Sequence, residues 1–82
     1  MNDEQIMALI RQALGSVAPT RTADFVNVAV ETKIEALGLD SIATMEMVNF
    51  IEEKIEATFP DEDLARVQKI GDLVGLVKSR RG

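Results

Sequence analysis

The 82-residue chain contains no histidine and no cysteine, and its only aromatic residues are three phenylalanines. Without an imidazole or a thiol, the usual general base and the usual strong nucleophile of hydrolytic enzymes are missing. The same absences exclude disulfide bonds and the common structural zinc sites, which fits a reducing compartment. Three phenylalanines provide no stacking platform for single-stranded nucleic acid. The composition therefore argues against catalysis by an activated serine or thiol and against nucleic-acid binding.

Longer sequence features are missing as well. No stretch approaches the roughly 18 apolar residues of a membrane-spanning helix, and the acidic start lacks the apolar segment of a signal peptide. The chain has no glycine-rich phosphate loop and no metal-ligand spacing. Most apolar side chains of so short a chain are needed for the core, which leaves little room for a ligand cleft. We expect a single domain over residues 1–82, monomeric, metal-free and cytoplasmic, with a radius of gyration of about 12 Å.

A first helix is predicted close to the N-terminus. Asn2 is a good N-cap residue, and Gln5 three positions later completes the pattern of a capping box. Gly15 is predicted to end this helix. Apolar residues recur at helical spacing and predict one buried face, made by Ile6, Leu9, Ile10, Ala13 and Leu14.

The segment from residue 16 to residue 38 has an irregular pattern. Val26, Val28 and Val30 alternate as in a short strand, but no second alternating run is present to pair with them. We therefore predict a long surface loop here and expect the three valines to hold it against the core.

A second helix is predicted from Asp40 or Ser41, either of which is a good N-cap residue, to Thr58, which Phe59-Pro60 follows. At about 100° per residue, one face is turned inward and consists of Thr44, Met47, Val48, Ile51, Ile55 and Thr58. Another face is turned outward and consists of Ser41, Ile42, Met45, Glu46, Asn49, Glu52, Glu53 and Glu56. Ser41 therefore stands at the head of an acidic face.

A short third helix and a longer final helix follow. Pro60 in the first helical position and the three acids after it predict a helix through Ala65. The final helix is predicted over residues 68–78, with inward residues Ile70, Leu73, Val74 and Val77. Gly71 and Gly75 lie inside it, and each costs about 1 kcal/mol relative to alanine, so they either weaken this helix or permit close packing.

The predicted fold is all-α. It is a small four-helix bundle, with three longer helices, one short helix and a long loop between the first and second helices.

The net charge of −5 is unevenly distributed. Between Asp40 and Asp63 there are eight acids and one base, Lys54, whereas the remainder has six acids and eight bases. An acidic face repels nucleic acid and attracts proteins with basic surfaces. A run of charges is equally typical of a solvated helix face without a partner. The charge pattern alone leaves both interpretations open.

Ser41 stands where a glycine-containing loop, Leu37-Gly38-Leu39-Asp40, turns into an amphipathic helix. Because no imidazole is available, any chemistry at Ser41 makes this residue the substrate of another enzyme. The sequence from Leu37 to Val48 resembles the acyl carrier proteins, whose signature is Asp-Ser-Leu at the start of the second helix. The resemblance continues through Glu52-Glu53 and residues 59–62 and covers nearly the whole chain.

The resemblance implies that a phosphopantetheinyl transferase attaches 4'-phosphopantetheine from coenzyme A to Ser41, and that Asp40 helps to position the serine. Acyl groups are then carried as thioesters on the terminal thiol of this arm. A phosphodiester at Ser41 would lie at a helix N-terminus, where backbone N–H groups and the helix dipole stabilise negative charge. The resemblance implies a non-catalytic carrier in fatty acid, specialised lipid or polyketide biosynthesis.

The resemblance also implies contacts with acyl-loading and elongation enzymes that have basic docking patches. The residues expected to bind these partners are Ile42, Met45, Glu46, Asn49, Glu52, Glu53 and Glu56. The family shelters its acyl chain among the helices, and the residues expected to line that space are Met47, Ile51, Ile55 and Phe59. An ordinary packed core is the alternative interpretation of these four residues.

Some positions depart from the commonest fatty-acid carrier pattern. Ile42 replaces leucine, Ala43 stands where an acid is frequent, Lys54 interrupts the acidic run, and Ile34 occupies a site often held by phenylalanine. These changes argue against housekeeping fatty-acid synthesis more than against the family. Within the family the second choice is an aminoacyl or peptidyl carrier. The alternative from a different class is an unmodified acidic helical adaptor that binds a basic protein.

Overall fold

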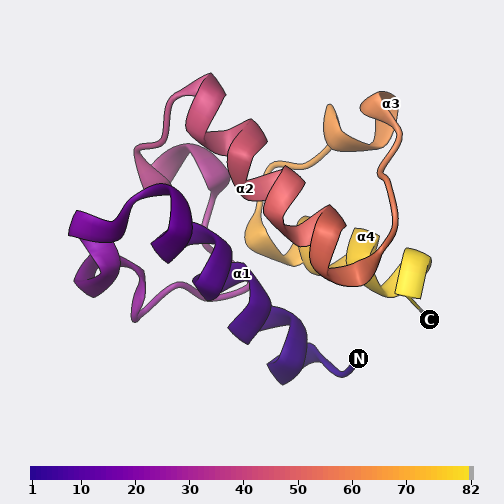
Figure 1. Ribbon diagram of the computed structural model, residues 1–82, viewed down its shortest axis with the longest axis horizontal. Coiled ribbons are helices and arrows are strands. Elements are labelled where there is room, and N and C mark those ends of the chain that lie inside the picture. Colours follow the sequence, from indigo (N-terminus) through magenta and orange to yellow (C-terminus); the bar gives the residue numbers. More distant parts are fainter. Residues whose placement is uncertain (82) are drawn as a thin grey trace.

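Three longer helices and one short helix make up the framework of the protein (Figure 1). The computed structural model describes residues 1–81. Its α-helices are α1 (Asp3–Val17), α2 (Ser41–Ile55), α3 (Asp61–Leu64) and α4 (Ile70–Arg81). Within this described part the chain forms no strand, and its single β-type contact is an isolated antiparallel bridge between Lys33 and Lys69. The all-α prediction is confirmed, and the Cα radius of gyration of 11.5 Å is close to the expected value.

Helix α1 begins as the sequence predicts and ends later. The Gln5 backbone N–H donates to the Asn2 side chain at 2.8 Å, and the Asn2 backbone N–H donates to the Gln5 side chain at 2.9 Å. Gly15 does not end the helix, which continues to Val17. The helix ends instead at Ala18, because a residue that precedes proline is disfavoured in the helical conformation.

The connection between α1 and α2 contains two short 3₁₀ helices, η1 (Pro19–Phe25) and η2 (Ile34–Leu37), that the sequence analysis missed. The absence of a strand among its described residues confirms that the alternating valines are not paired. Val28 is buried in the core, but Val26 and Val30 are exposed, so the expectation that all three hold the loop was wrong for two of them. Phe25 and Leu37 are the other buried residues of this connection.

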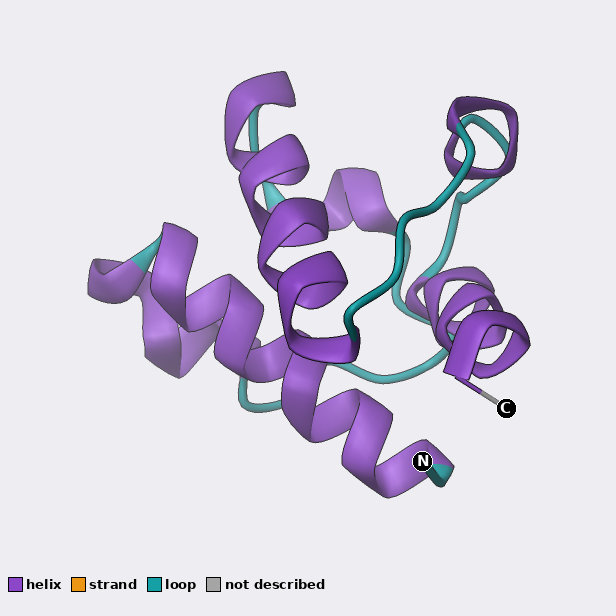
Figure 2. Ribbon diagram, turned by 45° about the vertical axis from the view of Figure 1, so that its right-hand side comes forward, coloured by secondary structure: helices purple, strands orange, loops and turns teal. Residues whose placement is uncertain are grey.

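Helix α2 begins at Ser41 with Asp40 as its N-cap and ends at Ile55. The predicted end at Thr58 was wrong, because Glu56 adopts the left-handed conformation (φ 56°) that terminates helices. Thr58 therefore lies outside the helix and is exposed rather than inward. Helix α3 is one residue shorter than predicted at each end, because Pro60 is its N-cap rather than its first helical residue and Ala65 is its C-cap. The connection from α2 to α4 runs out to α3 and back (Figure 2).

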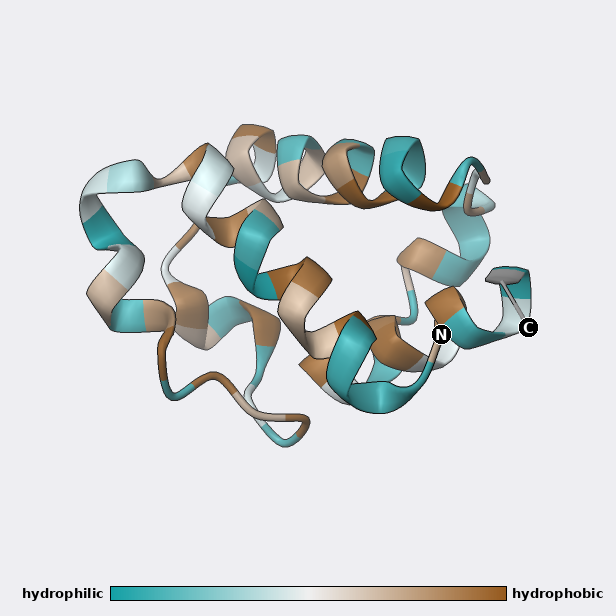
Figure 3. Ribbon diagram, turned by 60° about the horizontal axis from the view of Figure 1, so that its bottom comes forward, coloured by the Kyte–Doolittle hydropathy of each residue, from teal (hydrophilic) through white to brown (hydrophobic). Residues whose placement is uncertain are grey.

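Hydrophobic and hydrophilic residues alternate along each long helix, as Figure 3 shows. Helix α1 packs against α2, η1 and α4. All the apolar residues predicted to face inward from α1 and α4 are buried, and so are the four apolar inward residues of α2, Met47, Val48, Ile51 and Ile55. Burial of such aliphatic side chains stabilises a fold by about 1.5–3 kcal/mol each. The helical periodicity of the sequence therefore identifies the core.

The start of α1 and the end of α4 lie at the same end of the molecule (Figures 1 and 2). An ion pair joins the Lys78 Nζ of α4 to the Asp3 carboxylate of α1 at 2.6 Å.

No helix over the described residues is both long enough and apolar enough to cross a membrane.

The two glycines of α4 differ in their surroundings, which gives a stability prediction. A Cβ atom on Gly71 would lie 3.0 Å from the Val30 backbone oxygen, which accepts the Gly71 N–H at 2.9 Å. A Cβ on Gly75 would meet nothing within 4 Å. We expect Gly75→Ala to stabilise the protein by about 1 kcal/mol through helix propensity, and Gly71→Ala to destabilise it. Urea unfolding of both variants measures the difference, and equal stabilisation would contradict the close packing at Gly71.

Candidate functional site

Ser41 is the first helical residue of α2, and its side chain is exposed. The start of the helix is held by its neighbour Asp40, whose carboxylate accepts the Ala43 backbone N–H at 2.7 Å. The Asp40 carbonyl accepts both the backbone N–H and the hydroxyl of Thr44, each at 2.9 Å. Asp40 thus fixes the first turn and leaves Ser41 accessible beside the positive end of the helix dipole.

Arg21 holds the loop before Ser41 in place through hydrogen bonds to its carbonyl groups. This residue was not identified from the sequence. Its Nη2 atom donates to the Leu37 carbonyl at 2.7 Å, and its Nη1 atom lies 3.4 Å from the Gly38 carbonyl oxygen. Its Nε atom pairs with Asp24 at 3.1 Å, and the guanidinium lies 5.3 Å from the centre of the Phe25 ring. Gly38 adopts φ 70°, a conformation that favours glycine. Arg21 and Gly38 together set the path of the chain into Ser41.

We expect Arg21→Gln to lower the free energy of unfolding by about 1 kcal/mol, because the partly exposed guanidinium loses its two carbonyl contacts. We expect Arg21→Lys to have the same effect, since a single ammonium group cannot contact both carbonyls as the planar guanidinium does. Asp24→Asn is the matched control, because it removes only the exposed ion pair. Urea unfolding checks all three variants, and an Arg21→Lys protein as stable as the native one would contradict this function of Arg21.

The outward face of α2 has the exposure predicted for a contact surface. Ile42 and Met45 are 71% and 48% exposed, so both are turned outward as predicted. Glu46, Asn49, Glu53 and Glu56 are also exposed. Over the described residues, none of the acids from position 46 to position 56 forms an ion pair with lysine or arginine. This face therefore carries uncompensated negative charge beside two apolar side chains.

Two residues of the predicted contact surface differ from the rest. Glu52 is half-buried, and its carboxylate accepts the Phe59 backbone N–H at 2.7 Å, so it fastens the loop after α2. Glu56 is the C-cap of α2 and lies beyond the last helical residue. The acids that project from the helix itself without such a bond are Glu46 and Glu53.

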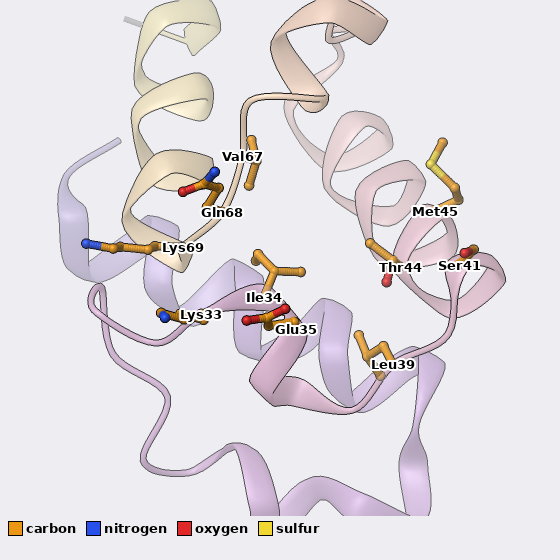
Figure 4. A pocket seen from close by; sticks show the side chains of 10 residues that line it. All are labelled: Lys33, Ile34, Glu35, Leu39, Ser41, Thr44, Met45, Val67, Gln68 and Lys69. Carbon is orange, nitrogen blue, oxygen red and sulfur yellow. The ribbon is translucent and has the colours of Figure 1, made fainter.

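A groove of about 680 Å³ opens beside Ser41 (Figure 4). Ser41, Thr44 and Met45 line it from α2, and Val67, Gln68 and Lys69 line it from the segment before α4. Its remaining lining residues come from the end of the long connection and are Lys33, Ile34, Glu35 and Leu39. A groove of this size is not expected for so short a chain, in which most apolar side chains are needed for the core.

A smaller apolar hollow of about 110 Å³ lies deeper, between α2 and the segments around α3 and α4. Of the four residues predicted to line an acyl-chain space, Met47 lines this hollow. Ile51, Ile55 and Phe59 are buried in the core and line neither the groove nor the hollow. Helical periodicity identifies buried positions, but it does not distinguish a tightly packed position from one beside a space.

Residues 4–77 match the family described as "Phosphopantetheine attachment site". An acyl carrier protein of an Exiguobacterium species is 32% identical over 81 residues, which cover 98% of this chain and 99% of the relative. The acyl carrier protein of Akkermansia muciniphila is 31% identical over 98% of this chain and 92% of the relative. The acyl carrier protein of Campylobacter jejuni is 36% identical over 87% of this chain and 94% of the relative.

The chain belongs to the acyl carrier protein family. Its domain is therefore of the type to which phosphopantetheine is attached, and members of this family are carriers rather than catalysts. The residues around Ser41 fit this group, because an exposed hydroxyl stands at a helix N-terminus next to an open groove.

Proposed function

We propose that this acyl carrier protein acts as a single domain over residues 1–82 and carries acyl intermediates on a 4'-phosphopantetheine arm attached to Ser41. It delivers them to enzymes of fatty acid, specialised lipid or polyketide biosynthesis and has no catalytic activity of its own. One observation carries the proposal. Ser41 is exposed at the N-terminus of α2, between the acidic outward face and the open groove.

The attachment step uses the hydroxyl of Ser41 as the nucleophile. Its oxygen forms a bond to the phosphorus nearer the pantetheine of coenzyme A, while the bond from that phosphorus to the departing adenosine bisphosphate breaks. The hydroxyl proton passes to a base of the transferase, because this chain has no histidine. The helix dipole and the N–H groups at the start of α2 would stabilise the negative charge of the phosphodiester. When bound, the arm supplies the thiol that this chain lacks.

The other two serines are less suitable for attachment. Ser16 lies in the last turn of α1, where the helix dipole disfavours an added anion. Ser79 lies in α4, and its hydroxyl donates to the Leu76 carbonyl at 2.8 Å. Neither serine follows an N-cap aspartate.

The outward face of α2 is the proposed docking surface for the transferase and for acyl-loading and elongation enzymes. Ile42 and Met45 supply exposed apolar contact, and the uncompensated acids steer basic partner patches toward Ser41. The proposed partner-binding residues are Ile42, Met45, Glu46, Asn49, Glu52, Glu53 and Glu56. The carboxylate of Glu52 also accepts the Phe59 N–H, so its main effect on docking is to shape the surface.

A long acyl chain is proposed to enter the hollow beside Met47 and to reach Ile51, Ile55 and Phe59 only by displacing packed side chains. We therefore expect an octanoyl group to change the amide chemical shifts of the residues that line the hollow, and an acetyl group to change them far less. NMR spectra of the two loaded proteins make the comparison. Identical spectra around Met47 would show that the chain stays in solvent.

The test of the proposed function is incubation with a broad-specificity phosphopantetheinyl transferase and coenzyme A. We expect the intact mass to rise by one phosphopantetheine, and fragmentation to place the added mass on Ser41. A protein that several such transferases leave unmodified would support the unmodified adaptor instead. Loading with aminoacyl rather than acyl groups in the producing organism would support the peptidyl carrier.

A further inference from the structure

Two backbone carbonyls of the loop before Ser41 depend on the side chain of Arg21. Its Nη2 atom lies 2.7 Å from the Leu37 carbonyl oxygen, and its Nη1 atom lies 3.4 Å from that of Gly38. Over residues 1–81 no backbone N–H donates to either carbonyl. The bond to Leu37 is partly buried, and a carbonyl that loses its donor in such a place destabilises the conformation that contains it.

The guanidinium of Arg21 is itself held in one orientation. Its Nε atom pairs with the Asp24 carboxylate at 3.1 Å, and its central carbon lies 5.3 Å from the centre of the Phe25 ring. Phe25 is buried in the core, so the ring supports the guanidinium from a fixed position. A planar group fixed in this way loses little freedom when it donates to two carbonyls at once.

Gly38 is the point at which the loop can change direction. It adopts φ 70°, and glycine passes readily between positive and negative values of φ. On the far side of Gly38 the chain is fixed again at Asp40, which caps α2. Only Leu39 lies between these two residues, so the contacts of Arg21 determine how the chain enters Ser41.

We propose that Arg21 is a positioning residue for attachment of the arm to Ser41, and that it keeps the loop in the conformation that the transferase binds. The inference rests on the proposed attachment at Ser41 and adds a residue that acts on it from another element. Arg21 belongs to η1 and does not line the groove beside Ser41, so it acts through the backbone of Leu37 and Gly38. A partner binds more weakly when only a fraction of the molecules has the conformation that it needs.

The experiment measures the kinetics of a broad-specificity transferase with this protein as the varied substrate. Arg21→Gln is expected to raise KM at least about 3-fold, which corresponds to a competent fraction of about a third or less. We expect kcat to change little, because the bound loop already has the competent conformation. Arg21→Lys is expected to raise KM equally, since it keeps the charge but not both contacts. An unchanged KM in Arg21→Gln, or a native KM in Arg21→Lys, would overturn the proposal.

Arg11→Gln is the matched control. The Arg11 Nη2 atom donates to the Val28 carbonyl at 3.1 Å, so this variant also removes one positive charge and an arginine contact to the same connection. Val28 precedes the second 3₁₀ helix and lies well before the loop that leads into Ser41. We expect a native KM. An equal rise in Arg11→Gln and Arg21→Gln would show that KM follows charge or general stability, and the proposal would fail.

Amide hydrogen exchange of the unmodified protein shows where Arg21→Gln loosens the chain. We expect faster exchange at Gly38, whose N–H donates to the Glu35 carbonyl at 3.3 Å, and native protection at the buried Ile51 of α2. Exchange at Gly38 as slow as in the native protein would show that the loop does not depend on Arg21.

The intact mass of the native protein after incubation separates this inference from the proposed function. A native protein that gains no arm means that the proposed function fails. An arm on the native protein together with a native KM in Arg21→Gln leaves the carrier in place and removes only the positioning by Arg21.

Discussion

Replacement of Ser41 by alanine is expected to abolish attachment of phosphopantetheine completely while leaving the protein folded. The substitution removes the hydroxyl oxygen to which the arm is proposed to be attached. No other serine lies at a helix N-terminus directly after an aspartate cap. The fold is expected to survive because Asp40, not Ser41, caps α2. Alanine is also a favourable residue inside a helix, so the free energy of unfolding should change by less than about 0.5 kcal/mol.

The measurement is the intact mass after incubation with transferase and coenzyme A, together with the circular dichroism spectrum of each variant. Ser16→Ala and Ser79→Ala are matched controls and are expected to gain one arm, as the native protein does. An arm on the Ser41→Ala protein would disprove the proposed attachment site.

Reversal of two charges on α2, Glu46→Lys with Glu53→Lys, is expected to slow attachment of the arm at least about 10-fold at low ionic strength. Electrostatic steering changes association rates by roughly 10- to 1000-fold, and these two acids are exposed and without ion pairs over the described residues. The difference from the native protein should shrink as salt rises, since exposed charges are then screened.

A second charge reversal separates local steering from the effect of net charge. Glu4→Lys with Glu31→Lys changes the net charge equally but lies on α1 and on the long connection. We expect this variant to retain most of the native rate. Equal slowing of both variants would show that total charge, rather than the outward face of α2, attracts the transferase, and unchanged rates in both would eliminate steering altogether.

Local sequence signals predicted much of this fold. Asn2 and Gln5 interact within one turn, and Asp40 caps the helix that follows it, so these starts depend on neighbouring residues only. Helical periodicity identified most buried positions of the three long helices, because one face of each must be covered in a domain this small. It did not identify Met7 of α1, which is also buried. The same reasoning placed Ser41 at a helix start, with Ile42 and Met45 turned outward.

The features that sequence reasoning missed depend on contacts between distant residues or on competing local signals. Gly15 is a typical helix stop, but the proline four residues later ends α1 instead. Glu56 ends α2 in a conformation that non-glycine residues seldom adopt.

Contacts between residues far apart in the sequence account for the other features that the sequence did not predict. Arg21 reaches the Leu37 carbonyl across 16 positions of the sequence, and the pairing of Lys33 with Lys69 exists only in the folded chain. A periodic pattern within one segment does not show which residue of another segment it will contact. For this reason the groove beside Ser41 emerged only from the structure.

Attachment of a phosphopantetheine arm to Ser41 in the cell can be measured as the intact mass of the protein purified from its own organism. We expect this mass to exceed that of the bare 82-residue chain by one phosphopantetheine, with or without an acyl group, and we expect fragmentation to place the excess on Ser41. A mass equal to that of the unmodified chain, or an excess located on another residue, would contradict the proposed attachment.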